Sequence, residues 1–95
     1  MRVIRHPEAA QELESAALWY EERQPGLGED FLGEYQATLR RILAAPERWH
    51  RIQGDNHKLN LHRFPYAIVY SVHVDTLRIK AVMHLRRRPF YWKHR

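Results

Sequence analysis

Residues 67–84 read AIVYSVHVDTLRIKAVMH, and their pattern is the strongest structural signal in the chain. Apolar side chains recur at every second position, the period of a β-strand that is buried on one face. Asp75 and Thr76 interrupt the alternation and suit a tight turn. If the turn closes there, Val74 pairs with Leu77 and the apolar sides of the two strands coincide. We therefore predict a hairpin of two strands, residues 67–74 and 77–84.

The predicted hairpin has an apolar face and a cationic face. On the apolar face we expect Ile68, Tyr70, Val72, Val74, Leu77, Ile79, Ala81 and Met83. On the opposite face we expect His73, Arg78, Lys80, Val82 and His84, which lead into Arg86, Arg87 and Arg88. The first face can be covered by other elements, whereas the second remains free to contact a target.

Two helices and two short strands are predicted before the hairpin. A first strand covers residues 1–5, and His6-Pro7-Glu8 then begins a helix that Gln24-Pro25-Gly26 ends. A second helix runs from near Gly28 to Pro46, and residues 58–62 alternate as a strand. On the first helix the carboxylates are expected largely on the face opposite the apolar stripe: Glu12, Glu14, Glu21 and Glu22.

These elements fit one domain that covers residues 1–95, because the chain is too short for a large doubly wound or barrel enzyme. Their order is β-α-α-β-β-β. We predict an α+β fold in which the N-terminal helical hairpin packs on one face of a twisted antiparallel sheet.

The charges divide unevenly along the chain, which has a net charge of +5. Residues 1–50 hold six basic and nine acidic side chains, whereas residues 51–95 hold ten basic and two acidic ones. Such an oriented field favours a polyanion or an acidic protein as the partner of the basic half. The alternative is a solvated surface with no partner.

Several classes of site are excluded or disfavoured. The chain has no cysteine, so disulfides and Cys-ligated metals are excluded. The histidine pairs His57/His62 and His84/His94 do not fit a compact metal motif, and no nucleophile motif or glycine-rich phosphate loop is present. We expect no cofactor and no metal. With no membrane span and no secretory signal in the sequence, we expect a cytoplasmic protein.

Residues 84–95 combine arginines with aromatic residues. Arginine can donate two hydrogen bonds to a phosphate, and aromatic rings can stack on bases. We therefore predict a target-binding surface made of Arg78, Lys80, His84, Arg86, Arg87, Arg88, Tyr91 and Trp92. The alternative is that Phe90 and Trp92 fill the bottom of a small core.

Short motifs in a fixed order extend over nearly the whole chain. They include Trp19-Tyr20, Pro25-Gly26-Leu27-Gly28, Arg63-Phe64-Pro65-Tyr66, Ile68-x-Tyr70, Ala81-Val82 and His84-x-Arg86-Arg87-x-Pro89. In these motifs the chain resembles the RelE/ParE superfamily of toxins from type II toxin–antitoxin, or plasmid stabilisation, modules. The resemblance implies a growth-inhibiting toxin in a hetero-oligomer with a cognate antitoxin, whose acidic, amphipathic segment folds on binding.

The superfamily has two activities, and the first is cleavage of mRNA in the ribosomal A site. Three positions where the RelE-like pattern has a cationic side chain are occupied here by Asn60, Ala67 and Leu85. A ribonuclease would have to rely on Lys58, His84, Arg86, Arg87 and Tyr91. Loss of one preorganised donor typically lowers an enzyme's rate by roughly 10²–10³.

The second activity, that of ParE-like members, is poisoning of DNA gyrase by binding it, which needs no catalytic set. The three departures from the RelE-like pattern favour this branch. We therefore predict a gyrase-inhibiting toxin, with a ribosome-dependent mRNA endonuclease as the alternative. A nucleic-acid-binding module unrelated to toxicity is the third hypothesis.

Overall fold

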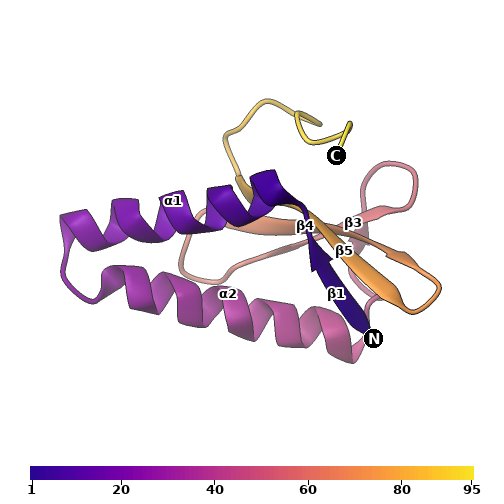
Figure 1. Cartoon of the computed structure of the whole chain (residues 1–95), viewed down its shortest axis with the longest axis horizontal. Helices are drawn as coiled ribbons and strands as arrows, with labels where there is room; N and C mark the ends of the chain where they lie inside the picture. Colours follow the sequence, from indigo (N-terminus) through magenta and orange to yellow (C-terminus); the bar gives the residue numbers. More distant parts are fainter.

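The computed structural model describes residues 1–95 as two helices and five strands (Figure 1). The α+β class, the predicted order of elements and the packing of the helical hairpin on one face of the sheet are confirmed. In chain order the elements are β1 (Arg2–Arg5), α1 (Pro7–Arg23), α2 (Leu27–Ala44), β2 (His50–Arg51), β3 (Asn56–Asn60), β4 (Tyr66–His73) and β5 (Thr76–His84). The short strand β2 was not predicted. Neither helix is apolar and long enough to span a membrane.

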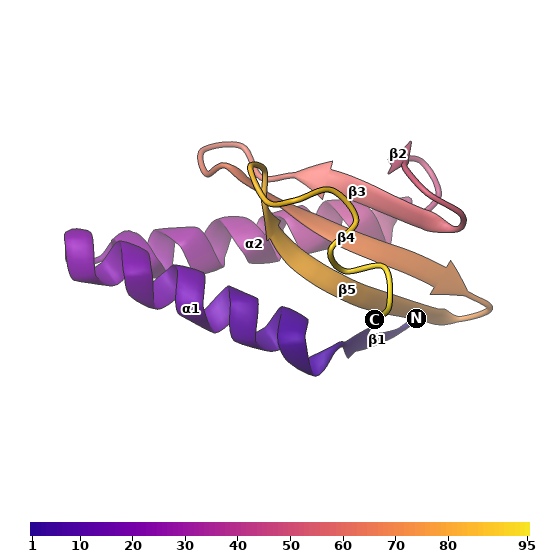
Figure 2. The same ribbon diagram turned by 90° about the horizontal axis from the view of Figure 1, so that it is seen from above.

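The sheet is mixed, with the strand order β1-β5-β4-β3-β2. Strands β2 to β5 are antiparallel neighbours, whereas β1 lies parallel to β5, with Arg2 opposite Thr76 (Figure 2). The prediction of a wholly antiparallel sheet is therefore wrong for β1. The long connection from β1 to β5, through both helices and three strands, allows parallel pairing, which a tight turn cannot provide.

The turn of the β4–β5 hairpin differs from the predicted one by one position. His73 pairs with Thr76, and Val72 pairs with Leu77, so Val74 and Asp75 form the turn. The predicted pairing of Val74 with Leu77 is wrong. Val74 has a positive φ of 58° and is 85% exposed, so it belongs to neither strand face.

A β-bulge in β5 changes which side chains face the helices. Val69 pairs with Ala81 and Tyr70 with Ile79, which leaves Lys80 as an extra residue. One extra residue reverses the alternation beyond it. As a result Val82 joins the core beneath the helices, while Ala81 packs on the opposite face.

The bulge therefore overturns four of the predicted face assignments. Ala81 and Met83 do not share a face with Leu77 and Ile79, and both pack with the cluster on the opposite side of the sheet. Val82 does not lie on the cationic face, and His84 lines a groove together with residues of α1.

Strand β3 begins at Asn56, two residues before its predicted start. The reason is that His57 pairs with Tyr70 and stacks on its ring, with the ring centroids 5.4 Å apart. A ring nitrogen of His57 also bonds the carbonyl oxygen of Trp49 at 2.9 Å. These contacts bury His57 and extend the strand.

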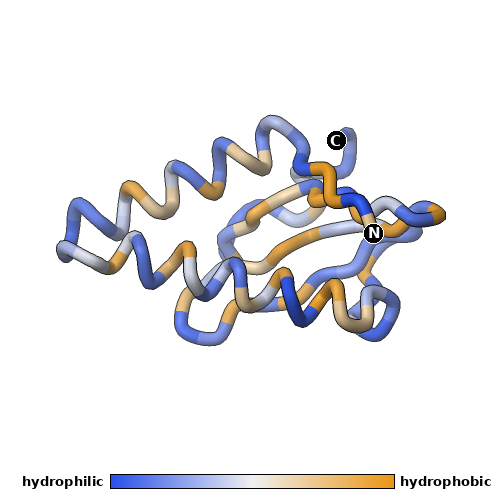
Figure 3. The backbone as a smooth tube through the Cα atoms, turned by 60° about the horizontal axis from the view of Figure 1, so that its bottom comes forward, coloured by the Kyte–Doolittle hydropathy of each residue, from blue (hydrophilic) through white to orange (hydrophobic).

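The main core lies between the helical hairpin and the sheet. Figure 3 shows apolar and polar positions alternating along both helices, as amphipathic helices require. Tyr20 and Phe31 of the helices pack against Phe64 and Tyr66, with ring centroids 4.8–5.2 Å apart in three of the contacts. The Arg63-Phe64-Pro65-Tyr66 motif thus supplies aromatic residues that join the end of the sheet to the helices.

A second, smaller core covers the outer face of the sheet, the face turned away from the helices. The tail (residues 89–95) crosses β4 and β5 here (Figure 2), and its Trp92 packs on Val69 and Ala81. Trp92 is 1% exposed, whereas Phe90 is 42% exposed. The core-filling alternative for the tail therefore holds for Trp92 and not for Phe90.

Candidate target-binding surface

Three consecutive arginines, residues 86–88, form an exposed turn after β5, which we call the arginine turn. His84 shapes it: its carbonyl accepts from the Arg87 amide at 3.0 Å, and its ring Nδ1 accepts from the Arg86 amide at 3.1 Å. The Leu85 amide donates to the carbonyl of Pro65 at 2.9 Å, which ties the turn to the loop before β4. The backbone therefore presents the arginine side chains to solvent from a well-anchored base.

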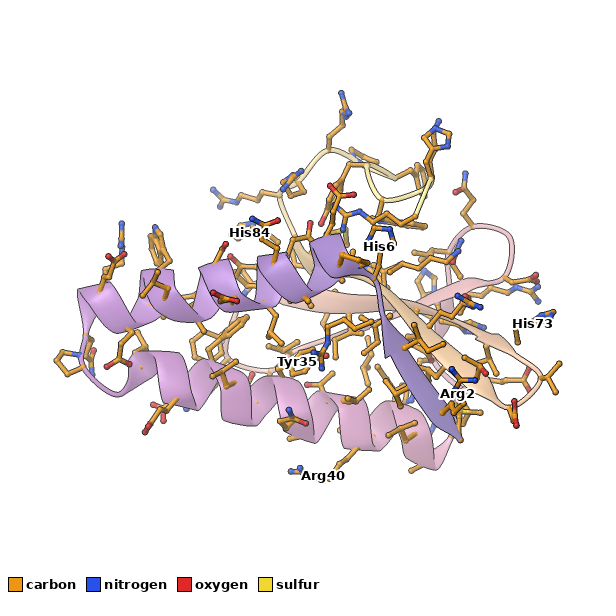
Figure 4. All side chains as sticks on the ribbon, in the orientation of Figure 1. Arg2, His6, Tyr35, Arg40, His73 and His84 are labelled. Carbon is orange, nitrogen blue, oxygen red and sulfur yellow. The ribbon has the colours of Figure 1, made fainter.

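The other predicted target-binding residues do not all lie beside this turn. Arg78 is exposed, but six residues of β5 place it roughly 20 Å from His84. Figure 4 shows His84 near α1 and His73 at the opposite end of the hairpin. Lys80 is partly buried at the bulge, and Trp92 is inside the outer core. The structure thus brings together His84, the arginine turn and Tyr91, and it leaves Arg78 and Trp92 outside this surface.

The aromatic ring of Tyr91 packs against the guanidinium group of Arg87. The guanidinium of Arg87 lies 4.0 Å from the centroid of the Tyr91 ring, and that of Arg95 lies 5.0 Å away. The Tyr91 hydroxyl donates to Glu12 Oε2 at 2.7 Å. Burial, together with this hydrogen bond to a carboxylate, raises the pKa of Tyr91 well above its ordinary value. Tyr91 therefore stays a neutral hydrogen-bond donor whose hydroxyl is already occupied.

Two grooves meet at Arg87. The first has a volume of about 380 Å³, lies on the outer face and contains Lys58 and Arg87 above apolar side chains that include Met83 and Leu85. The second has a volume of about 390 Å³ and lies between α1 and the end of the hairpin, where it contains His84, Trp19 and Arg87. Lys58 and His84 therefore line different grooves.

The residues proposed for a ribonuclease are accordingly divided. Lys58 lines the outer groove and His84 lines the groove beside α1, and of these residues only Arg87 lines both. General acid–base chemistry needs a proton donor and acceptor on either side of one reacting group. This division disfavours a catalytic set assembled from the predicted residues.

Sequence reasoning missed the role of Glu12. Its side chain accepts hydrogen bonds from Tyr91, Arg95 and the Val82 amide, so it does not lie on the solvated face expected for it. The signal was its place in the helix: Glu12 falls three residues after Ala9 and four before Ala16, both buried. A carboxylate between two buried helical positions indicates a buried partner.

No group of three or more His, Asp or Glu side chains gathers where it could hold a metal ion. The arrangement offers instead a cationic, partly aromatic surface, made of the arginine turn, His84 and Tyr91. Such a surface suits recognition of an acidic protein or a polyanion.

The helical hairpin and the order of the elements agree with the fold that the resemblance to the RelE/ParE superfamily predicted. The model of one family within it, the ParE toxin of the type II toxin–antitoxin system parDE, matches residues 3–89. The chain therefore belongs to the ParE toxin family, and the predicted branch is confirmed.

A solved structure supports the same fold. The chain is similar to a chain of the chromosomal ParDE toxin–antitoxin system from P. aeruginosa, with a TM-score of 0.64 and 17% sequence identity. The match covers 88% of this chain and 95% of the other. No curated protein is significantly similar to the chain in sequence.

Proposed function

We propose that this ParE-family toxin inhibits DNA gyrase by binding it, and that a cognate antitoxin neutralises it. The observation that carries the proposal is the arginine turn, which is exposed and anchored at the end of β5. In the proposed setting the protein acts in the cytoplasm, restrains growth and stabilises a plasmid that encodes the pair.

Binding explains the surface better than catalysis does. Ala67 and Leu85 provide no charge where a ribonuclease of the superfamily would have one, and the Tyr91 hydroxyl is held by Glu12. A binding toxin needs only a stable cationic surface of the correct shape. Residues 86–88 provide three guanidinium groups, each able to donate two parallel hydrogen bonds to a carboxylate or phosphate.

The antitoxin is proposed to be an acidic, amphipathic segment. Its acidic side chains would neutralise the basic half of the chain, where ten basic side chains face two acidic ones. Its apolar side chains would cover exposed apolar residues of the helical hairpin, among them Leu18 and Trp19. Folding on contact lets such a segment cover a large surface.

The test compares gyrase with the ribosome. The purified protein is expected to block DNA supercoiling by gyrase and to leave ribosome-bound mRNA intact. A variant with alanine at residues 86–88 should lose most of the inhibition. Arg40→Ala is the matched control, because Arg40 is an exposed arginine of α2 that points away from this surface (Figure 4).

The opposite outcome is equally clear. Cleavage of mRNA in the A site of programmed ribosomes, lost on Tyr91→Phe, would establish the ribonuclease and overturn the gyrase proposal. Inhibition of gyrase that survives the triple substitution would show that the arginine turn is not the contact surface.

A further inference from the structure

We propose that Glu12 is a positioning residue, which fixes the tail on the sheet and through it orients Arg87 of the arginine turn. The part of this inference that concerns a target rests on the proposed function. The part that concerns the position of the tail does not, because it follows from contacts within the chain.

The first step concerns the free edge of β5. Strand β1 pairs with β5 only as far as Ile79, and the His6 amide donates the last bond of this ladder to the Ile79 carbonyl. Beyond that point no strand lies on this side of β5, whereas its other side stays paired with β4 as far as His84. Unpaired backbone groups at a sheet edge attract other strands or must be satisfied in another way.

Two side chains satisfy this edge. The Val82 amide donates to Glu12 Oε1 at 3.0 Å, and the Lys80 carbonyl accepts from Arg95 Nη1 at 3.1 Å. The same Nη1 also donates to Glu12 Oε1 at 2.9 Å. Glu12 and Arg95 therefore take the place of a neighbouring strand, one as acceptor and the other as donor.

The ion pair between Glu12 and Arg95 is shielded from water. The side chains are 17% and 10% exposed, and Arg95 lies 3.7 Å from Glu8 as well. Burial lowers the pKa of Arg95, but the hydrogen bond and negative charge of Glu12 outweigh it, so the pKa is raised overall. Removing Glu12 would leave the largely buried Arg95 guanidinium with only the more distant Glu8 carboxylate, so the contact holds the tail strongly.

The second oxygen of Glu12 reaches the arginine turn through Tyr91. Oε2 accepts the Tyr91 hydroxyl at 2.7 Å, and the Arg87 guanidinium lies over the Tyr91 ring. Trp92, the next residue, packs on Val69 and Ala81. One carboxylate thus determines where the tail lies, where the Tyr91 ring lies and where the charge of Arg87 lies.

The experiment compares Glu12→Ala, Glu12→Gln and Arg95→Ala with the controls Glu14→Ala and Lys93→Ala. Glu14 and Lys93 are exposed neighbours of the substituted residues, and their side chains make no hydrogen bond or ion pair. Three quantities are measured for each variant: hydrogen exchange of the Val82 amide, the NMR shift of the Arg87 side chain, and the concentration that inhibits gyrase by half.

In the wild type and in both controls we expect a protected Val82 amide and Arg87 side-chain protons shifted upfield by the Tyr91 ring. Glu12→Ala should lose both signatures and inhibit gyrase about tenfold more weakly, the cost of one or more charge-assisted hydrogen bonds. Glu12→Gln keeps the acceptor for Val82 and should restore its protection and part of the inhibition. Arg95→Ala should loosen the end of the tail while leaving the Val82 amide bound to Glu12.

The outcomes separate the two proposals. If Glu12→Ala retains the upfield Arg87 shift, or loses it and still inhibits gyrase as the wild type does, Glu12 does not position Arg87 for the target. If the wild type itself fails to inhibit gyrase, the proposed function is wrong, and the exchange and NMR measurements still decide whether Glu12 fixes the tail. If Glu12→Ala does not fold, Glu12→Gln and Arg95→Ala decide the question.

Discussion

Gly28 determines how closely the two helices approach. A Cβ atom at this position would lie 2.5 Å from the carbonyl oxygen of Ala17 and 2.9 Å from the Cβ of Glu21. The Gly28 amide also donates to Glu21 Oε1 at 3.0 Å, as does the Gly26 amide, so the Glu21 carboxylate caps the start of α2. The Pro-Gly turn was evident from the sequence, but the need for a second glycine two residues later is a property of helix packing.

We therefore expect Gly28→Ala to destabilise the protein by about 1–3 kcal/mol, because a backbone atom of α1 has to move. Gly33→Ala is the matched control. Gly33 lies within the same helix with open space around it, so alanine should stabilise the protein by about 0.5–1 kcal/mol. Urea unfolding of both variants measures the two effects, and equal effects would show that the helices do not meet closely at Gly28.

Ionisation of the buried Tyr70 hydroxyl should lower the free energy of unfolding at high pH. The side chain is fully buried, and its hydroxyl donates to the Pro46 carbonyl at 2.6 Å. Burial raises the pKa of Tyr70 to about 12. Because this value exceeds that of the unfolded chain, about 10, the stabilisation by neutral Tyr70 is complete below pH 10 and is lost as the pH rises toward 12.

Across this range Tyr70 should account for a loss of up to roughly 2 kcal/mol in the free energy of unfolding. Tyr70→Phe should be about 1 kcal/mol less stable at pH 7, where the hydrogen bond is missing, and should show a shallower decline above pH 10. Denaturant unfolding at several pH values provides both numbers. Parallel curves for the two proteins would contradict the assignment.

The elements show where prediction from the sequence succeeds and fails. Both helices were predicted nearly to their ends, because Pro7, Pro25 and Pro46 limit what the backbone can do. The bulge at Lys80 was missed, because residues 81–83 are all apolar and fit either face. Where consecutive residues are all apolar, their alternation does not show which of them faces the helices. An extra residue in such a run therefore cannot be located from the sequence. The parallel pairing of β1 was missed because four residues do not encode a direction.

The candidate site was predicted in part for a similar reason. The arginine turn follows from composition, since three adjacent arginines cannot be buried. Whether the aromatic residues beside it are buried or exposed depends on contacts with parts of the chain that are distant in sequence. Tyr91 meets Glu12, and Trp92 meets Val69, neither of which is near the tail in sequence.

The tail provides a direct comparison of two aromatic side chains. Trp92→Ala is expected to cost about 3–5 kcal/mol of stability, because it empties the outer core. Phe90→Ala should change stability by less than about 1 kcal/mol, since Phe90 is 42% exposed and lies at the rim of this core. Thermal unfolding of the pair is the measurement. Similar melting temperatures would mean that the tail does not pack on the sheet.

The molecule as a whole carries its charges on different sides. The acidic side chains lie mainly on α1 and α2, whereas the strands, the arginine turn and the tail carry most of the basic ones. This asymmetry orients the protein as an acidic partner approaches, before any contact forms. It was visible in the sequence as a division between the two halves of the chain.

We expect added salt to slow the association of the toxin with its antitoxin more than it speeds their dissociation. Screening acts over the long range that governs encounter, whereas contacts at short range are less affected. Stopped-flow measurement between low and high salt tests this, with Arg40→Ala expected to retain the wild-type dependence. An association rate that does not change with salt would remove the electrostatic part of the proposed partnership.

The parallel pairing of β1 with β5 has a consequence for biosynthesis. A ribosome delivers Arg2–Arg5 first, but the strand they pair with, Thr76–Ile79, emerges only near the other end of these 95 residues. The hydrogen-bond partners of Glu12 in the tail, Tyr91 and Arg95, are likewise synthesised long after Glu12 itself. A nascent chain that stops partway has neither a closed sheet nor a seated tail, and such distant pairings form slowly. An incomplete molecule therefore lacks the β1–β5 pairing and the packed tail, so the proposed target-binding surface exists only after residues 76–95 have been made.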